Sequence, residues 1–190
     1  MAKINVLDRQ VAELIAAGEV VERPASIVKE LVENAVDAGA TKITVEIQGG
    51  GVRYIRVTDN GSGILREDVK NAFLRHATSK VRVQEDLGHI TTMGFRGEAL
   101  ASIAAMCRVE MLTRTADEIA GTRYTIAGGE PGELADAGCP VGTTISVRDV
   151  FYNTPARMKF LKKDLSEGNS VAAVVEKEAL ANPQISFKFI

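Results

Sequence analysis

Polar side chains recur one helical turn apart between residues 27 and 38. Glu30 and Asn34 are four residues apart, as are Glu33 and Asp37, so a helix would place all four on one stripe. The amide oxygen of an asparagine can bind Mg²⁺, which prefers oxygen ligands and few protein contacts. A carboxylate one turn earlier can take a proton from a water aimed at a phosphate. The stripe equally fits the solvated face of a surface helix, so both interpretations stay open here.

A second candidate group is Asp59-Asn60-Gly61-Ser62-Gly63, which follows a short apolar strand. An ionised Asp59 can accept a hydrogen bond from an amine, and Gly61 and Gly63 let a ring approach the backbone. The same residue types favour an ordinary turn. Further along, Gly142-Thr143-Thr144 opens a strand, where threonine hydroxyls either bind a ligand or simply suit the strand.

A third group is the glycine-bracketed segment Gly94-Phe95-Arg96-Gly97, directly before a predicted helix. Backbone N–H groups at a helix N-terminus form a site for phosphate, although the segment also fits a plain capping loop. The sequence contains neither a GxxxxGK[ST] motif nor a GxGxxG after a strand. Phosphates are therefore not held by a P-loop, and dinucleotide binding is disfavoured.

Hydrophobic periodicity predicts the elements that must position these groups. Helices are expected over residues 7–17, 27–38, 68–76, 98–105 and 166–181. Strands are expected over 42–47, 53–57, 108–114, 122–127, 143–150 and 185–190, the first two forming a hairpin. Residues 78–97 and 127–141 are interpreted as loops. The expected fold is an α+β two-layer sandwich built on a mixed sheet.

Composition restricts the class of protein. The 190 residues, 45% hydrophobic and 25% charged, fit one globular domain. The start of the chain lacks the apolar core of a signal peptide, and no apolar stretch is long enough for a membrane span, so a cytoplasmic protein without membrane contact is expected. Cys107 and Cys139 lie outside any zinc motif and are expected to be free thiols.

A net charge of −2 argues against a strongly basic nucleic-acid binder. A local basic segment is nevertheless present, formed by Arg157, Lys159, Lys162 and Lys163. It faces either the phosphate backbone of DNA or plain solvent at the end of a helix.

The chemical groups occur together and in a specific order. The Glu–Asn helix, the DxGxG turn, the glycine-bracketed segment and the late Gly-Thr-Thr together resemble the Bergerat ATP-binding fold of the GHKL family. That family includes DNA gyrase B subunits, sensor histidine kinases, heat-shock chaperones and MutL proteins. Four further stretches resemble its MutL branch: IAAGEVVERP (15–24), RHATSK (75–80), GFRGEALASI (94–103) and FYNTPAR (151–157). The resemblance covers nearly the whole chain; only residues from about 116 to 141 lack a recognisable pattern.

This resemblance implies an ATPase that uses ATP and Mg²⁺, on a mostly antiparallel sheet with helices on one face. It implies that Glu30 is the general base, that Asn34 holds Mg²⁺ and that Asp59 recognises the adenine amine. Other residues implied to bind the nucleotide are Asp37 on the same helix, Gly61, Gly63 beside the base, and Thr143 supporting that contact. The lid over the phosphates is implied to contain Thr78, Ser79, Lys80, Gly94, Phe95, Arg96 and Gly97, with the backbone N–H of Leu100 nearby.

For the longer protein, the resemblance implies slow ATP hydrolysis that drives conformational switching in DNA mismatch repair. Its expected partners are a second copy joined through the N-terminal regions, the mismatch-recognition protein MutS, and DNA. Residues 1–190 would form the first subdomain, with a second subdomain and a C-terminal dimerisation domain beyond Ile190. Two alternatives remain: a nucleotide-gated interaction module with little turnover, and a gyrase-like ATPase domain. The FRGEAL and FYNTPAR segments disfavour the second.

Overall fold

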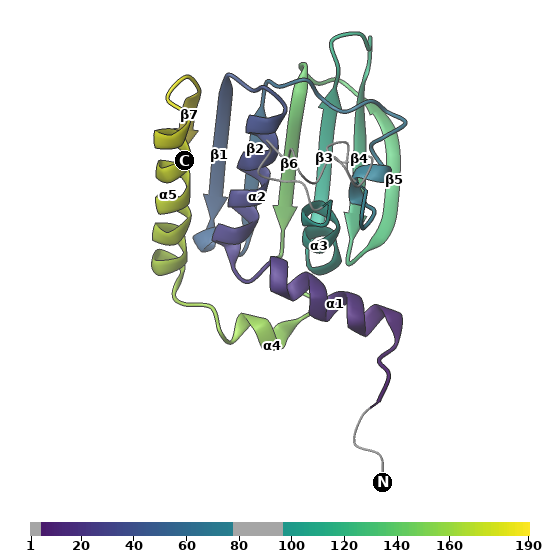
Figure 1. Cartoon of the computed structure of the whole chain (residues 1–190), viewed down its shortest axis with the longest axis vertical. Helices are drawn as coiled ribbons and strands as arrows, with labels where there is room; N and C mark the ends of the chain where they lie inside the picture. Colours follow the sequence, from purple (N-terminus) through teal and green to yellow (C-terminus); the bar gives the residue numbers. More distant parts are fainter. Residues whose placement is uncertain (1–4, 78–96) are drawn as a thin grey trace, which may run out of the picture.

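The computed structural model describes residues 5–77 and 97–190. They form a seven-stranded sheet in the order β5-β4-β3-β6-β2-β1-β7 (Figure 1). Only β1 and β7 pair in parallel, and the other neighbours are antiparallel. The predicted mixed, mostly antiparallel sheet is confirmed. Its strands are β1 (Lys42–Gln48), β2 (Tyr54–Asp59), β3 (Arg108–Arg114), β4 (Gly121–Ala127), β5 (Glu130–Ala137), β6 (Gly142–Arg148) and β7 (Ser186–Phe189).

The helices form the second layer of the sandwich. Helices α2 and α3 run across one face of the sheet, and α1 crosses below its lower end in Figure 1. Helix α5 packs against α2. The helices are α1 (Arg9–Val20), α2 (Pro24–Asp37), α3 (Ala99–Met106), α4 (Pro155–Met158) and α5 (Asp164–Ala181), with short 3₁₀ turns η1 (Gly49–Gly51) and η2 (Asn71–Phe73). Among the described residues, no helix is both long and apolar enough to cross a membrane.

Helix α2 presents its apolar stripe to the sheet. It begins at Pro24, whose fixed φ suits a first helical turn, three residues before the predicted start. It ends before Gly39, which takes a φ of +73°. The stripe is buried in one core with apolar residues of the central strands; its members are Ile27, Val28, Leu31, Val32 and Ala35. Because that stripe faces the sheet, the polar stripe of α2 is left for the site.

Two predicted elements were wrong. The helix expected over 68–76 is reduced to η2, because Phe73 turns inward onto the Tyr124 ring, 5.5 Å between centroids, and the next residue is already extended. The loop expected over 127–141 contains β5. Glycine, proline and acidic residues are tolerated there because β5 is an edge strand, with one side unpaired.

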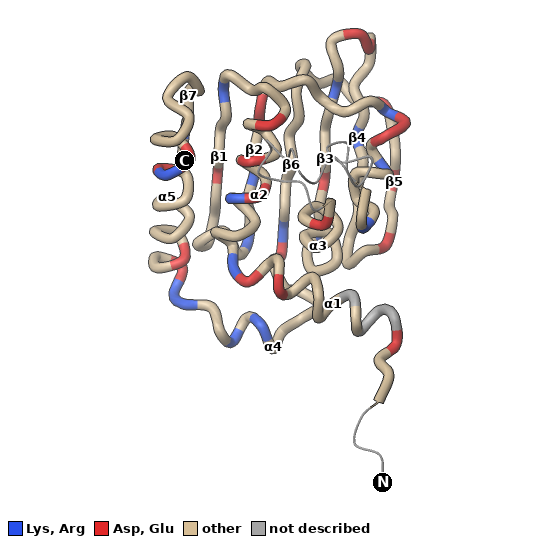
Figure 2. Tube along the Cα trace, in the orientation of Figure 1, with Lys and Arg blue, Asp and Glu red and all other residues tan. Residues whose placement is uncertain are grey.

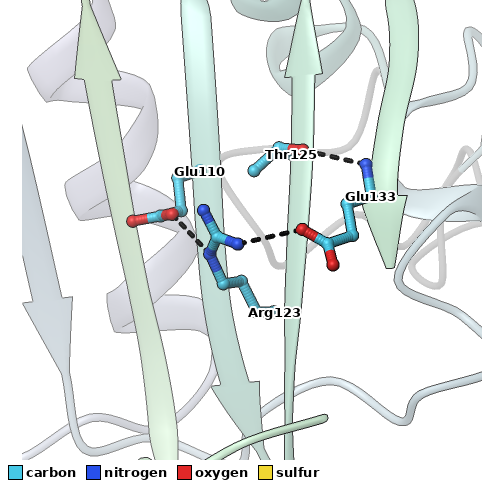
Figure 3. A network of polar contacts seen from close by, with 4 residues as sticks. All are labelled: Glu110, Arg123, Thr125 and Glu133. Atoms are coloured by element: carbon cyan, nitrogen blue, oxygen red, sulfur yellow. Dashed lines mark hydrogen bonds and ion pairs between the residues drawn. The ribbon is translucent and has the colours of Figure 1, made fainter. Parts of the chain in front are cut away.

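A polar network holds this edge to the sheet (Figure 3). From β4, Arg123 reaches Glu110 on β3 at 2.6 Å and Glu133 on β5 at 3.2 Å. The backbone N–H of Glu133 also donates to the hydroxyl of Thr125 at 2.9 Å. One of the acidic residues that gave this stretch its loop-like composition, Glu133, therefore joins β5 to β4, and Arg123 continues the network to Glu110 on β3.

Candidate functional site

A cavity of about 1660 Å³ lies between α2, the loop after β2, the start of α3 and the beginning of β6. Eight of the predicted site residues, from segments far apart in sequence, line it: Glu30, Asn34, Asp37, Asp59, Gly63, Gly97, Leu100 and Thr143. The fold therefore brings the separate sequence motifs to one place.

Asp59 ends β2, which lies between β1 and β6 in the sheet. Its side chain is 9% exposed, and its Oδ1 accepts the backbone N–H groups of Gly61 at 2.8 Å and Thr143 at 3.2 Å. Burial raises the pKa of Asp59, and the two N–H groups oppose that shift. Because both bonds engage Oδ1, the carboxylate keeps acceptor capacity for a ligand amine in the cavity.

The loop after Asp59 needs its glycines because it packs tightly against neighbouring backbone. Gly63 has a φ of +73°, and a Cβ there would lie 2.2 Å from the carbonyl oxygen of Arg114. A Cβ on Gly61 would lie 2.7 Å from the carbonyl oxygen of Ala38, at the end of α2. Gly61 is buried against that helix end and does not line the cavity, unlike Gly63.

The polar stripe of α2 forms one wall of the cavity. Glu30, Asn34 and Asp37 are partly buried, and all three line the cavity. Glu33 is only 5% exposed and is paired with Lys29 one turn earlier. The carboxylates and the amide of this wall are therefore held close to any bound ligand.

The same wall fits a Mg²⁺ ion that the protein contacts sparsely. Within the described part of the chain, no three His, Cys, Asp or Glu side chains gather in a way that could hold a metal ion. Mg²⁺ commonly keeps water and phosphate ligands and takes only one or two from protein. The amide oxygen of Asn34, with carboxylates beside it, suits that role and not a metal cage.

Ala77 and Gly97 lie close together at the cavity. A Cβ on Gly97 would lie 2.6 Å from the carbonyl oxygen of Ala77, and His76 Nδ1 lies 3.3 Å from Glu98 Oε1. Leu100 follows in the first turn of α3. Six predicted site residues lie outside the described residues: Thr78, Ser79, Lys80, Gly94, Phe95 and Arg96.

Two residues support the Asp59 loop through contacts that the sequence did not predict. Asn60 accepts the N–H groups of Thr41 and Lys42 through Oδ1, which fastens the loop to the start of β1. Thr113, on β3, accepts the backbone N–H of Ile64 at 2.9 Å and touches the Thr143 hydroxyl. A threonine within a strand carries no pattern that signals such a contact.

Glu118 was also missed, in the stretch that lacks a recognisable motif. It accepts the backbone N–H groups of Thr115 and Arg66 and the Thr115 hydroxyl. Those hydrogen bonds lower the pKa of Glu118, with the Thr115 backbone as the largest contribution. The carboxylate therefore joins the end of the Asp59 loop to the turn between β3 and β4.

The predicted basic segment divides into two parts. Arg157 donates to the carbonyl oxygen of Gly18 at 2.9 Å, so this residue joins α4 to α1. Lys159, Lys162 and Lys163 are exposed, and positive charge follows α4 and its connection to α5 in Figure 2. None of the four lines the cavity.

Comparisons with known proteins identify the family of the chain. The family described as "Histidine kinase-, DNA gyrase B-, and HSP90-like ATPase" matches residues 22–127. The chain is 57% identical over its whole length to the DNA mismatch repair protein MutL of Agathobacter rectalis, and 56% identical to that of Caldanaerobacter subterraneus. It spans 29% and 32% of the length of those relatives.

Solved structures give the same result. The Aquifex aeolicus MutL ATPase domain complexed with ADP superposes with a TM-score of 0.75 at 37% identity, covering 90% of this chain and 60% of that one. The N-terminal domain of a DNA repair protein superposes with a TM-score of 0.79 at 28% identity, covering 94% and 51%. The chain thus belongs to the GHKL family of histidine kinase-, DNA gyrase B- and HSP90-like ATPases, within which it corresponds to the N-terminal ATPase region of MutL proteins.

Proposed function

We propose that the chain binds ATP in this cavity and hydrolyses it slowly with Mg²⁺. The observation that carries the proposal is the buried Asp59 carboxylate, fixed by two backbone N–H groups in the same cavity as Glu30 and Asn34. A related ATPase domain, 37% identical to this chain, has been solved in complex with ADP.

Each residue has a separate role in this proposal. Asp59 accepts a hydrogen bond from the exocyclic amine of adenine. Glu30 takes the proton from the water that attacks the terminal phosphate, and Asn34 offers its amide oxygen to Mg²⁺. When bound, Mg²⁺ supplies neutralisation of phosphate charge. The protein's part is therefore positioning and proton removal, which is most of what phosphoryl transfer needs.

We also propose the context of this activity from the relatives' names. Residues 1–190 would be the first subdomain of an ATPase region whose nucleotide-dependent switching and dimerisation serve DNA mismatch repair. MutS and DNA would be its partners. The relatives are bacterial, and bacterial DNA lies in the cytoplasm, where we place this function.

The test is Glu30→Ala, with nucleotide binding measured by calorimetry and hydrolysis by phosphate release. Binding should persist while turnover falls by roughly 10²–10⁴, the usual contribution of a positioned base. Glu176→Ala, at an exposed position on α5, is the matched control and should behave as wild type.

Three outcomes would count against the proposal in different ways. Turnover within a few-fold of wild type would remove Glu30 from the mechanism. A wild-type chain that binds ATP without measurable turnover would support the interaction module instead. Absence of nucleotide binding would remove the assignment of the cavity.

A further inference from the structure

Behind the Asp59 carboxylate lies a chain of hydrogen bonds that the proposed roles do not use. Thr113 is fully buried, and its Oγ1 lies within hydrogen-bonding distance of three groups. They are the N–H of Ile64 at 2.9 Å, the carbonyl oxygen of Gly142 at 3.1 Å and the hydroxyl of Thr143 at 3.0 Å. Thr143 in turn donates its backbone N–H to Asp59.

Counting protons fixes the direction of these bonds. A hydroxyl has one proton to donate and two lone pairs. The N–H of Ile64 can only donate and the carbonyl oxygen of Gly142 can only accept, so the Thr113 proton goes to Gly142. The Thr143 hydroxyl must then donate to Thr113. The reverse assignment would leave two oxygens 3.1 Å apart with no proton between them.

This direction has a consequence in the cavity, which both Asp59 and Thr143 line. With its proton committed to Thr113, the Thr143 hydroxyl offers a ligand only lone pairs. The ionised Asp59 also offers only acceptors. An exocyclic amine, as on adenine N6, complements such a site, whereas the O6 carbonyl of guanine does not.

We propose that Thr113 is a specificity-determining residue: it accepts the hydrogen bond of the Thr143 hydroxyl, so that the base end of the cavity presents two acceptors and selects adenine nucleotides over guanine nucleotides. Thr113 acts through Thr143 and does not touch the ligand. The inference rests on the proposed function, because it presupposes that the cavity binds a nucleotide.

The experiment measures the affinities of ADP and GDP, each with Mg²⁺, by calorimetry on the 190-residue chain. Thr113→Val keeps the shape and removes the hydroxyl, which frees the Thr143 hydroxyl to rotate and donate to a carbonyl. The preference for ADP over GDP should fall about tenfold, the size expected from one neutral hydrogen bond. Thr113→Ser keeps a hydroxyl and should keep the preference.

Thr122→Val is the matched control. Thr122 is 2% exposed and pairs directly with Thr113 across the strands, but its hydroxyl contacts Arg66, at 3.4 Å, and not the Asp59 chain. Its preference for ADP should equal that of wild type. A thermal melt of each variant reports any loss of stability separately from the affinity ratio.

An unchanged ratio of ADP affinity to GDP affinity in a folded Thr113→Val would overturn the inference, even if both affinities fall. If Thr113→Val fails to fold, Thr143→Val is measured instead. This variant should reduce the preference for ADP over GDP similarly, and an unchanged affinity ratio in Thr143→Val would refute the role of the hydroxyl. A wild-type chain that binds neither nucleotide would remove the proposed function itself. A chain that binds both with equal affinity removes only the specificity.

Discussion

Replacing Asp59 with Asn should separate ligand binding from folding. The side chain keeps its shape, and its amide oxygen can still accept the N–H groups that now reach Oδ1. The group directed at the ligand changes from a charged acceptor to an NH₂ donor, which opposes an adenine amine. Nucleotide affinity should therefore fall while the fold persists.

The size of the loss follows from the hydrogen bond removed. A hydrogen bond to a charged group contributes about 1.5–3 kcal/mol, so its loss corresponds to a roughly 10- to 150-fold larger dissociation constant.

The free energy of unfolding, by contrast, should rise or stay the same in Asp59→Asn. Because burial raises the folded-state pKa of Asp59, the folded protein binds more protons than the unfolded chain between the two pKa values. The free energy of unfolding therefore falls as pH rises through that interval, and Asn avoids the loss.

The assay pairs ADP calorimetry with thermal melts at pH 7, with Asp164→Asn at the exposed start of α5 as control. We expect weaker binding and an equal or higher Tm for Asp59→Asn, and unchanged binding for the control. Wild-type affinity would show that the adenine is recognised elsewhere. A clear drop in Tm would show that the Asp59 charge stabilises the fold, contrary to the burial argument.

Three further outcomes are expected. Gly63→Ala should lower the ADP affinity, and it should lower the Tm by more than Gly39→Ala does. Both glycines have a φ of +73°, but an added Cβ would meet backbone only at Gly63. Equal losses of Tm would show that the backbone angle alone matters. Burial raises the pKa of the Cys107 thiol to about 12. At pH 8 a thiol reagent should therefore modify the partly exposed Cys139 first in the native protein. Rapid modification of Cys107 in the native protein would contradict its burial. If the exposed lysines of the basic segment bind DNA phosphates, Lys162→Glu with Lys163→Glu should weaken DNA binding and flatten its dependence on salt, whereas an unchanged slope assigns them to plain solvent exposure.

Local patterns were enough to predict most of the scaffold. Alternation and glycine placement gave the β1–β2 hairpin, and the bounds of β3 are those predicted, Arg108–Arg114. Strand β5 was missed because an edge position tolerates proline, glycine and acids, so its composition resembles a loop. The helix over 68–76 was wrong because the tertiary contact of Phe73 overrides the local pattern.

The site could be predicted only where its chemistry is concentrated in short motifs. Glu30, Asn34 and Asp59 belong to such motifs, and the structure places them in one cavity. Thr113 and Glu118 act through partners far away in sequence, such as Ile64 and Arg66. The spacing of residues in the sequence cannot predict such contacts, because the fold alone determines which backbone group faces each side chain.

The strand order has a consequence for how the protein opens. Strand β6, late in the chain, lies between β2 and β3 at the centre of the sheet, and Thr143 reaches Asp59 and Thr113 only from there. Any excursion that releases β6 therefore destroys the base end of the cavity. A ligand at 100 times its dissociation constant adds about 2.7 kcal/mol against such openings. Bound nucleotide should accordingly slow amide hydrogen exchange in β2, β3 and β6, while the fraying of β5 and β7 at the two edges continues at its own rate.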